Sequence, residues 1–86
     1  MKNDGITIVL GPEWDDALRS SLLDVLRELG ATEVSREWGV GGSQEIETLV
    51  VKLGDQVLSI EAETYIGLSV TGPRDLVERV QSMMRR

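Results

Sequence analysis

Two glutamates and a tyrosine alternate in the stretch IEAETYIGLSVTG at residues 60–72. Because Glu61, Glu63 and Tyr65 are every second residue, their side chains share one face of an extended strand. Neighbouring carboxylates can act as a general acid and base or hold a hard cation, but both roles require a sheltered pocket. On an open sheet face the simplest interpretation is solvated glutamates, and the sharper one is a surface that binds a protein.

The residue types behind most hydrolytic and metal chemistry are missing. The chain has no His and no Cys, so the usual general base, thiolate nucleophile and zinc ligands do not occur. The glycine-rich segment GVGGSQ at residues 39–44 lacks the Lys-Ser/Thr ending of a phosphate-binding loop, and it is typical of a flexible turn. We therefore expect a protein that is not an enzyme and that binds no metal or cofactor.

The net charge of −6 is concentrated in the middle of the chain. Residues 31–71 hold seven acidic and two basic side chains, a net charge of −5, whereas residues 72–86 carry +2. An acidic surface repels nucleic-acid phosphates, so the expected partner is a basic protein and not a nucleic acid. The N-terminal apolar run is too short to cross a bilayer, and the absence of Cys fits a reducing compartment, so we expect a cytoplasmic protein that binds no membrane.

Hydrophobic periodicity predicts one domain, residues 1–86, with a strand and a helix at its start and a second helix at its end. Residues 6–10 are a short apolar run between glycines, typical of a buried strand. Pro12 then stands at a position that favours the first helical turn, and the segment ends at Gly30. The expected core-facing residues of this helix are Trp14, Leu18, Leu22, Val25, Leu26 and Leu29. The corresponding residues of the C-terminal helix are Leu76, Val77, Val80, Met83 and Met84.

Three strands are expected between the helices. Residues 32–40 alternate weakly and are followed by a GGSQ turn, and Gly54-Asp55 is a two-residue hairpin signal. That turn pairs Leu49 with Ile60 and Val51 with Leu58 on an apolar face. The last strand is long enough to bend, or to split in two, near Gly67. The predicted fold is α+β: a single layer of mostly antiparallel sheet with two helices on one face, in the order β-α-β-β-β-α.

The same hairpin register would place the carboxylate of Glu47 on the apolar face, which is costly. A bulge near Thr48 resolves this conflict by turning Glu47 outward. Glu45 and Glu47 would then join the glutamates of the opening stretch on the face that the helices leave open. Trp38 lies on the apolar side of its strand, where it either caps the edge of the core or serves as an exposed binding anchor.

The segments WGVGGSQEIE and EAETYIGLSVTGP, within residues 38–73, resemble parts of small acidic bacterial immunity proteins. The resemblance implies a protein that neutralises a toxin, and an acidic surface is suited to covering a basic one. Charge and exposure select the expected partner-binding residues, which are Glu61, Glu63, Tyr65, Glu45, Glu47 and Trp38.

Two other functional classes stay open at this point. A regulatory or structural module could self-associate through an exposed edge strand such as residues 32–40. A small carboxylate-based enzyme is the other class. The oligomeric state is not determined by the sequence, although like charges on the acidic face favour a monomer.

Overall fold

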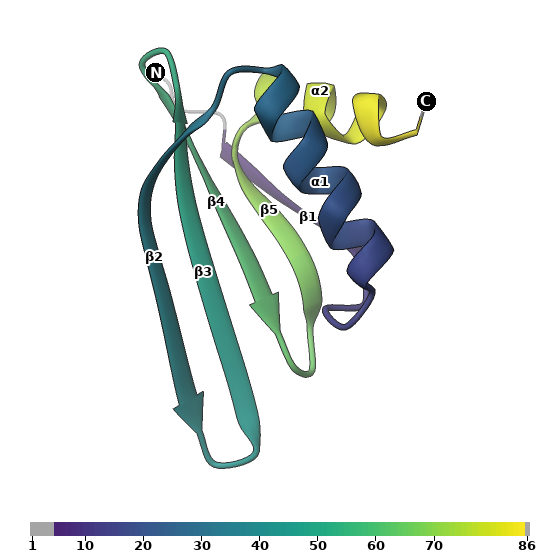
Figure 1. Ribbon diagram of the computed structural model, residues 1–86, viewed down its shortest axis with the longest axis vertical. Coiled ribbons are helices and arrows are strands. Elements are labelled where there is room, and N and C mark those ends of the chain that lie inside the picture. Colours follow the sequence, from purple (N-terminus) through teal and green to yellow (C-terminus); the bar gives the residue numbers. More distant parts are fainter. Residues whose placement is uncertain (1–4, 86) are drawn as a thin grey trace.

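A five-stranded antiparallel sheet carries both helices on one face (Figure 1). The computed structural model describes residues 5–85. In chain order the elements are β1 (Gly5–Gly11), α1 (Asp16–Glu28), β2 (Thr32–Gly41), β3 (Gln44–Leu53), β4 (Gln56–Glu63), β5 (Gly67–Pro73) and α2 (Arg74–Met84). The strands lie in the order β1-β5-β4-β3-β2 across the sheet, and all neighbouring pairs are antiparallel. The predicted fold class is confirmed.

The long last strand of the prediction is two strands, β4 and β5, which pair as a hairpin. Residues 64–66 form the turn between them, and Gly67 has φ of +114°, a conformation that L side chains rarely adopt. The split near Gly67 is therefore confirmed, and a single bent strand is wrong. Ile66 is exposed in this turn, and Ser69 of β5 is buried.

The β3–β4 hairpin has the predicted register. Leu49 lies opposite Ile60, Val51 lies opposite Leu58, and the turn falls at Gly54 and Asp55. The pairing continues unbroken to the start of β3, so Glu47 lies opposite Ala62. The predicted bulge near Thr48 is wrong.

Helix α1 begins later than expected. Its first residue is Asp16, and the N-cap Asp15 accepts a hydrogen bond from the backbone N–H of Leu18 at 3.0 Å. The carboxylate of Asp15 accepts a hydrogen bond from a helix-terminal N–H, and the Pro12 side chain has no such acceptor. The helix therefore begins after Asp15, and Pro12 lies in the preceding loop. Trp14 belongs to that loop as well, and its expected place in the core is wrong, since it is 71% exposed.

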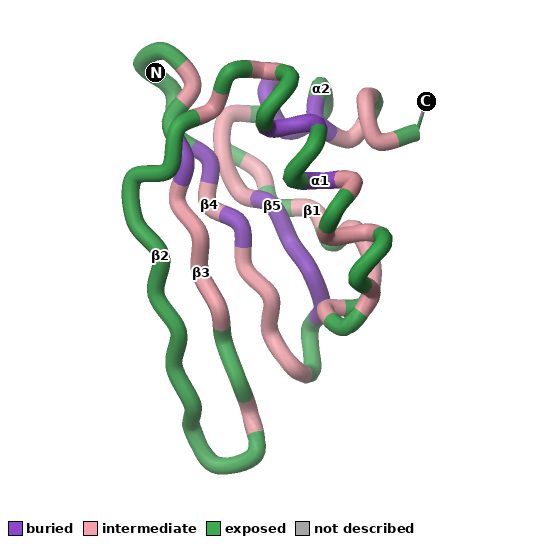
Figure 2. The backbone as a smooth tube through the Cα atoms, in the orientation of Figure 1, coloured by how far each residue is buried: buried purple, intermediate pink, exposed green. Residues whose placement is uncertain are grey.

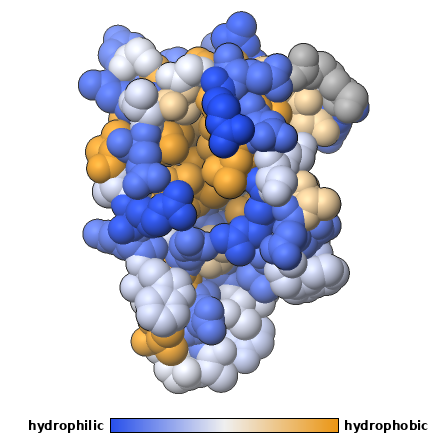
Figure 3. Space-filling view, viewed as in Figure 1, coloured by the Kyte–Doolittle hydropathy of each residue, from blue (hydrophilic) through white to orange (hydrophobic). Residues whose placement is uncertain are grey.

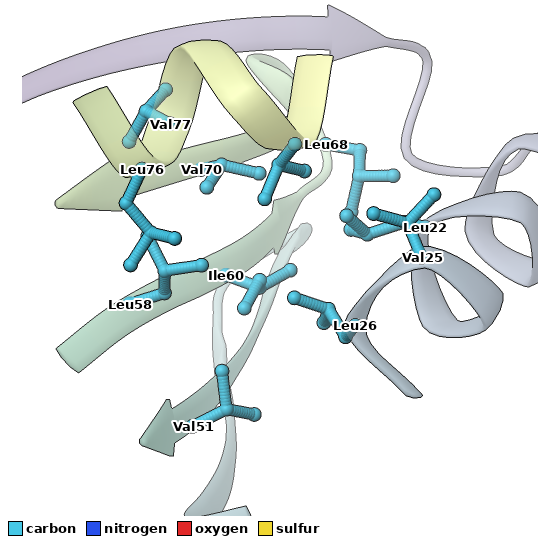
Figure 4. Packing of buried hydrophobic residues seen from close by; sticks show 11 residues of the cluster. Leu22, Val25, Leu26, Val51, Leu58, Ile60, Leu68, Val70, Leu76 and Val77 are labelled. Atoms are coloured by element: carbon cyan, nitrogen blue, oxygen red, sulfur yellow. The ribbon is translucent and has the colours of Figure 1, made fainter. Parts of the chain in front are cut away.

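The core lies between the helices and one face of the sheet (Figure 4). It contains no aromatic ring, because the chain has no Phe and neither its tryptophans nor its tyrosine is buried. Its buried members are Leu22, Val25 and Leu26 of α1, Leu76, Val77 and Val80 of α2, and Val51, Leu58, Ile60, Leu68 and Val70 of the sheet. These include the central residues of both predicted helix stripes.

Strand β2 lies outside this core. Every residue of β2 is exposed, and it forms the edge of the sheet (Figure 2). The β2–β3 hairpin also extends past the β4–β5 turn, so its tip projects beyond the rest of the sheet (Figure 1). Within residues 5–85, neither helix combines the length and apolarity that crossing a membrane requires.

Candidate functional site

The six residues predicted to bind a partner lie on two faces of the sheet and at its end. Glu45 and Glu47 share the helix-bearing face with Val51, since alternate residues of β3 point the same way. Glu61 and Glu63 alternate with the buried Ile60 in β4 and therefore lie on the opposite face. The predicted continuous acidic face is wrong, because without a bulge the register cannot bring the two pairs together.

Glu47 is accommodated on the helix-bearing face by two arginines. Arg19 of α1 donates a hydrogen bond from Nη2 to Oε1 of Glu47, and Nη1 of Arg36 in β2 lies 3.7 Å from Oε2. The Glu47 side chain is 31% exposed, so its charge is compensated by these partners and partly by water. Sequence reasoning missed this contact, although Arg19 precedes Leu22 by three residues and so lies on the same side of α1.

The other face holds the remaining two glutamates in different surroundings. Oε1 of Glu63 accepts a hydrogen bond from Nε2 of Gln44 at 2.7 Å. Glu61 lies opposite Thr48 on β3 and Ser69 on β5. Both glutamates are half-buried and not fully exposed as expected. This face therefore carries only two carboxylates, with hydroxyl groups beside them, and not an extended acidic patch.

Hydrogen bonds join the β4–β5 turn to the tip of the β2–β3 hairpin. The backbone N–H of Glu45 donates to Oγ1 of Thr64 at 2.7 Å, and the N–H of Thr64 donates to the carbonyl of Glu45 at 3.1 Å. The hydroxyl of Tyr65 lies 3.0 Å from that of Ser43. These bonds fix the relative positions of the two turns, and Tyr65 remains 71% exposed there.

Beside these turns, on the helix-bearing face, lies a hollow of about 150 Å³. Trp14 and Trp38 both line it, and they are 71% and 66% exposed. Its other lining residues are Glu13, Arg19, Glu45, Glu47, Ala62 and Thr64. We call this feature the tryptophan hollow. The exposed alternative for Trp38 fits its position, whereas Trp14 was missed because it was assigned to the helix stripe.

The tryptophan hollow continues into a smaller one of about 60 Å³ beneath α1, which shares Arg19, Glu47 and Ala62. The floor of the smaller hollow is apolar and includes Leu49 and Ile60. Figure 3 shows the same face of the molecule, where apolar surface is sunk between strongly hydrophilic groups. The arginine–glutamate contact therefore lies where an apolar groove meets a polar, aromatic hollow.

The tryptophan hollow is acidic. Three carboxylates line it, from Glu13, Glu45 and Glu47, against the one guanidinium of Arg19. Glu47 is the carboxylate bound by Arg19 and Arg36. Among the described ion pairs none involves Glu13 or Glu45, so these two negative charges face the hollow without a counter-ion. Within residues 5–85, no three acidic side chains are arranged so that they could hold a metal ion together.

No protein-family model, curated protein or solved structure matched the chain. The resemblance to immunity proteins therefore stays a prediction, and a functional proposal has to rest on the site itself.

Proposed function

We propose that this chain is a non-enzymatic binding protein of the immunity-protein or antitoxin class, which neutralises a basic toxin or effector in the cytoplasm. Its binding surface is the hairpin end of the sheet, which we define as Glu13, Trp14, Trp38, Glu45, Glu63 and Tyr65. This surface replaces the acidic sheet face of the prediction.

The observation that carries the proposal is the placement of the aromatic residues. The chain has only two tryptophans and one tyrosine, all three are at least 66% exposed, and all three lie at this end. Aromatic side chains gain the most free energy from burial, yet this fold leaves all of them in water. Trp and Tyr are also enriched among the interface residues whose truncation to alanine costs the most binding affinity. A partner that covers them would recover that burial.

The charge of the surface selects the kind of partner. Glu13 and Glu45 have no ion-pair partner in the described chain, and the whole molecule carries a charge of −6. Such a field accelerates encounter with a basic protein and opposes encounter with an acidic one.

Co-expression with the products of the genes that flank its own tests the proposal. We expect one of these products to arrest growth, and co-expression of this chain to relieve the arrest through a stoichiometric complex. Trp38→Ala and Tyr65→Ala should each weaken that complex by about 2 kcal/mol or more in calorimetric titrations. Val57→Ala, which truncates an exposed apolar residue near the opposite end of β4, is the matched control. Absence of any complex, or equal affinity of all three variants, would refute the proposal.

A second candidate function is self-association through β2. This edge strand has ten residues, all exposed, and it presents the large apolar side chains of Val34, Trp38 and Val40. An uncovered edge can pair with the same strand of a second copy across a two-fold axis.

A further inference from the structure

The tryptophan hollow combines two exposed indole rings with two carboxylates, those of Glu13 and Glu45, that have no ion-pair partner among residues 5–85. We propose that it receives a cationic side chain, arginine or lysine, from the partner protein. This inference rests on the proposed function and specifies which part of the partner the hairpin end of the sheet recognises.

The aromatic lining is suited to a cation. An ammonium or guanidinium group is attracted to the face of an aromatic ring, most strongly to that of Trp. The volume of about 150 Å³ is far more than the roughly 10–15 Å³ that a cavity needs to hold one water, so the hollow has room for the end of a long side chain. The adjoining hollow beneath α1 holds only about 60 Å³. Of these two adjoining hollows, the tryptophan hollow is the one with room for a whole charged group.

The charges around the hollow favour the same occupant. Arg19 is the basic residue that lines the hollow, and both it and Arg36 lie against the carboxylate of Glu47. Glu13 and Glu45 remain to pair with an incoming cation. An arginine could stack on an indole ring and direct its planar fork at a carboxylate, whereas a lysine would act as a point charge.

The walls of the hollow are held in place before a partner arrives. The backbone of Glu45 is bonded to Thr64 in both directions, and the Arg19–Glu47 contact joins α1 to β3. Trp14 immediately precedes Asp15, whose side chain caps α1. A site already ordered in the free protein loses less entropy on binding.

The chain supplies its own reporter, because its only two tryptophans both line the hollow. We would titrate the protein at low salt with blocked tripeptides Gly-Xaa-Gly, up to millimolar concentrations, and record tryptophan fluorescence. The four central residues are arginine, lysine, citrulline and glutamate. We expect the arginine and lysine peptides to bind, and citrulline, which has nearly the shape of arginine without its charge, to bind about tenfold more weakly. The comparison of arginine with lysine shows which cation the hollow prefers.

Variants then locate the binding. Trp14→Leu and Trp38→Leu each leave one tryptophan as reporter, and each should weaken the arginine peptide by about five- to tenfold. Glu45→Gln should weaken it by about threefold or more. Asp55→Asn removes the same charge at the β3–β4 turn and should leave binding unchanged. Dispersed amide NMR spectra would confirm that each variant is folded.

Equal affinity for the arginine and citrulline peptides, tighter binding of the glutamate peptide, or indifference to the hollow variants would overturn the inference. The two proposals fail separately. A flanking gene product that binds through Trp38 and Tyr65, with no binding of the arginine peptide, removes the cation site and leaves the proposed function standing. Selective peptide binding with no complex from any flanking product supports the site and refutes the proposed function.

Discussion

At the scale of single residues, Glu47 shows how a carboxylate is tolerated beside an apolar core. Its strand neighbours Leu49 and Val51 point at the helices, and Glu47 points the same way. A partly buried carboxylate without a partner would lose solvation and gain nothing. Arg19 and Arg36 supply the partners, from a helix and from an edge strand that are distant in sequence. The same residue therefore joins three elements and borders the tryptophan hollow.

We expect Glu47→Gln to lower the free energy of unfolding by about 1 kcal/mol, because it removes the carboxylate partner of Arg19 and leaves Arg36 with that of Glu33 alone. The loss should shrink in about 1 M salt, where charge interactions are screened within about 3 Å. Glu61→Gln on the other face is the control and should change stability by less than about 0.5 kcal/mol. Urea melts at low and high salt measure both. Equal losses in the two variants would show that the arginine contacts contribute no stability.

At the scale of elements, glycines decide where the strands reverse. Gly67 begins β5 with φ of +114°, and a Cβ there would lie only 2.5 Å from the carbonyl oxygen of Gly11. Gly54 in the β3–β4 turn also has a positive φ, +63°, but a Cβ there would meet nothing within 4 Å. Gly67 is therefore required by both its backbone conformation and the lack of space for a side chain, whereas Gly54 is required by its conformation alone.

We predict that Gly67→Ala destabilises the protein by about 2–4 kcal/mol, since it adds backbone strain and a clash with the neighbouring strand. Gly54→Ala should cost only about 1–2 kcal/mol, the penalty of a left-handed conformation for an L residue. Chemical denaturation of the two variants makes the comparison directly. Similar losses would mean that the close approach of β1 and β5 is relieved without cost.

At the scale of the whole molecule, the helices cover the sheet unevenly from one edge strand, β1, to the other, β2. The core beneath the helices extends from β1 to β3, whereas β2 is exposed along its whole length (Figure 2). A protein-binding domain and a self-associating module would both use such an exposed end, but they differ in what the free chain does. Glu33, Arg36 and Glu37 place charges along the β2 edge, and charged edges oppose strand pairing.

We therefore expect a monomer in analytical ultracentrifugation at micromolar concentration. Val40→Lys, which adds a charge to the edge, should leave the sedimentation coefficient unchanged. A dimer that Val40→Lys dissociates would instead support self-association through β2 over the proposed function.

Much of the fold followed from local patterns. Aliphatic residues at helical spacing marked α1 and α2, and a Gly-Asp turn between alternating segments determined the β3–β4 register, because side-chain direction depends only on spacing within one element. The helix-bearing face could be predicted on the same basis. The start of α1 was not predicted correctly, because Asp15, three residues after Pro12, caps the helix and sets its first residue at Asp16.

The sequence by itself determined an acidic, His- and Cys-free α+β domain with an aliphatic core and with Glu61 and Glu63 on the face away from that core. Only the tertiary structure decided that Glu47 faces the helices, because the two arginines that stabilise it stand 28 and 11 positions earlier in the chain. It also placed Trp14 beside Trp38, 24 positions apart in the chain. Contacts between separate elements depend on how those elements pack, and no local periodicity encodes them.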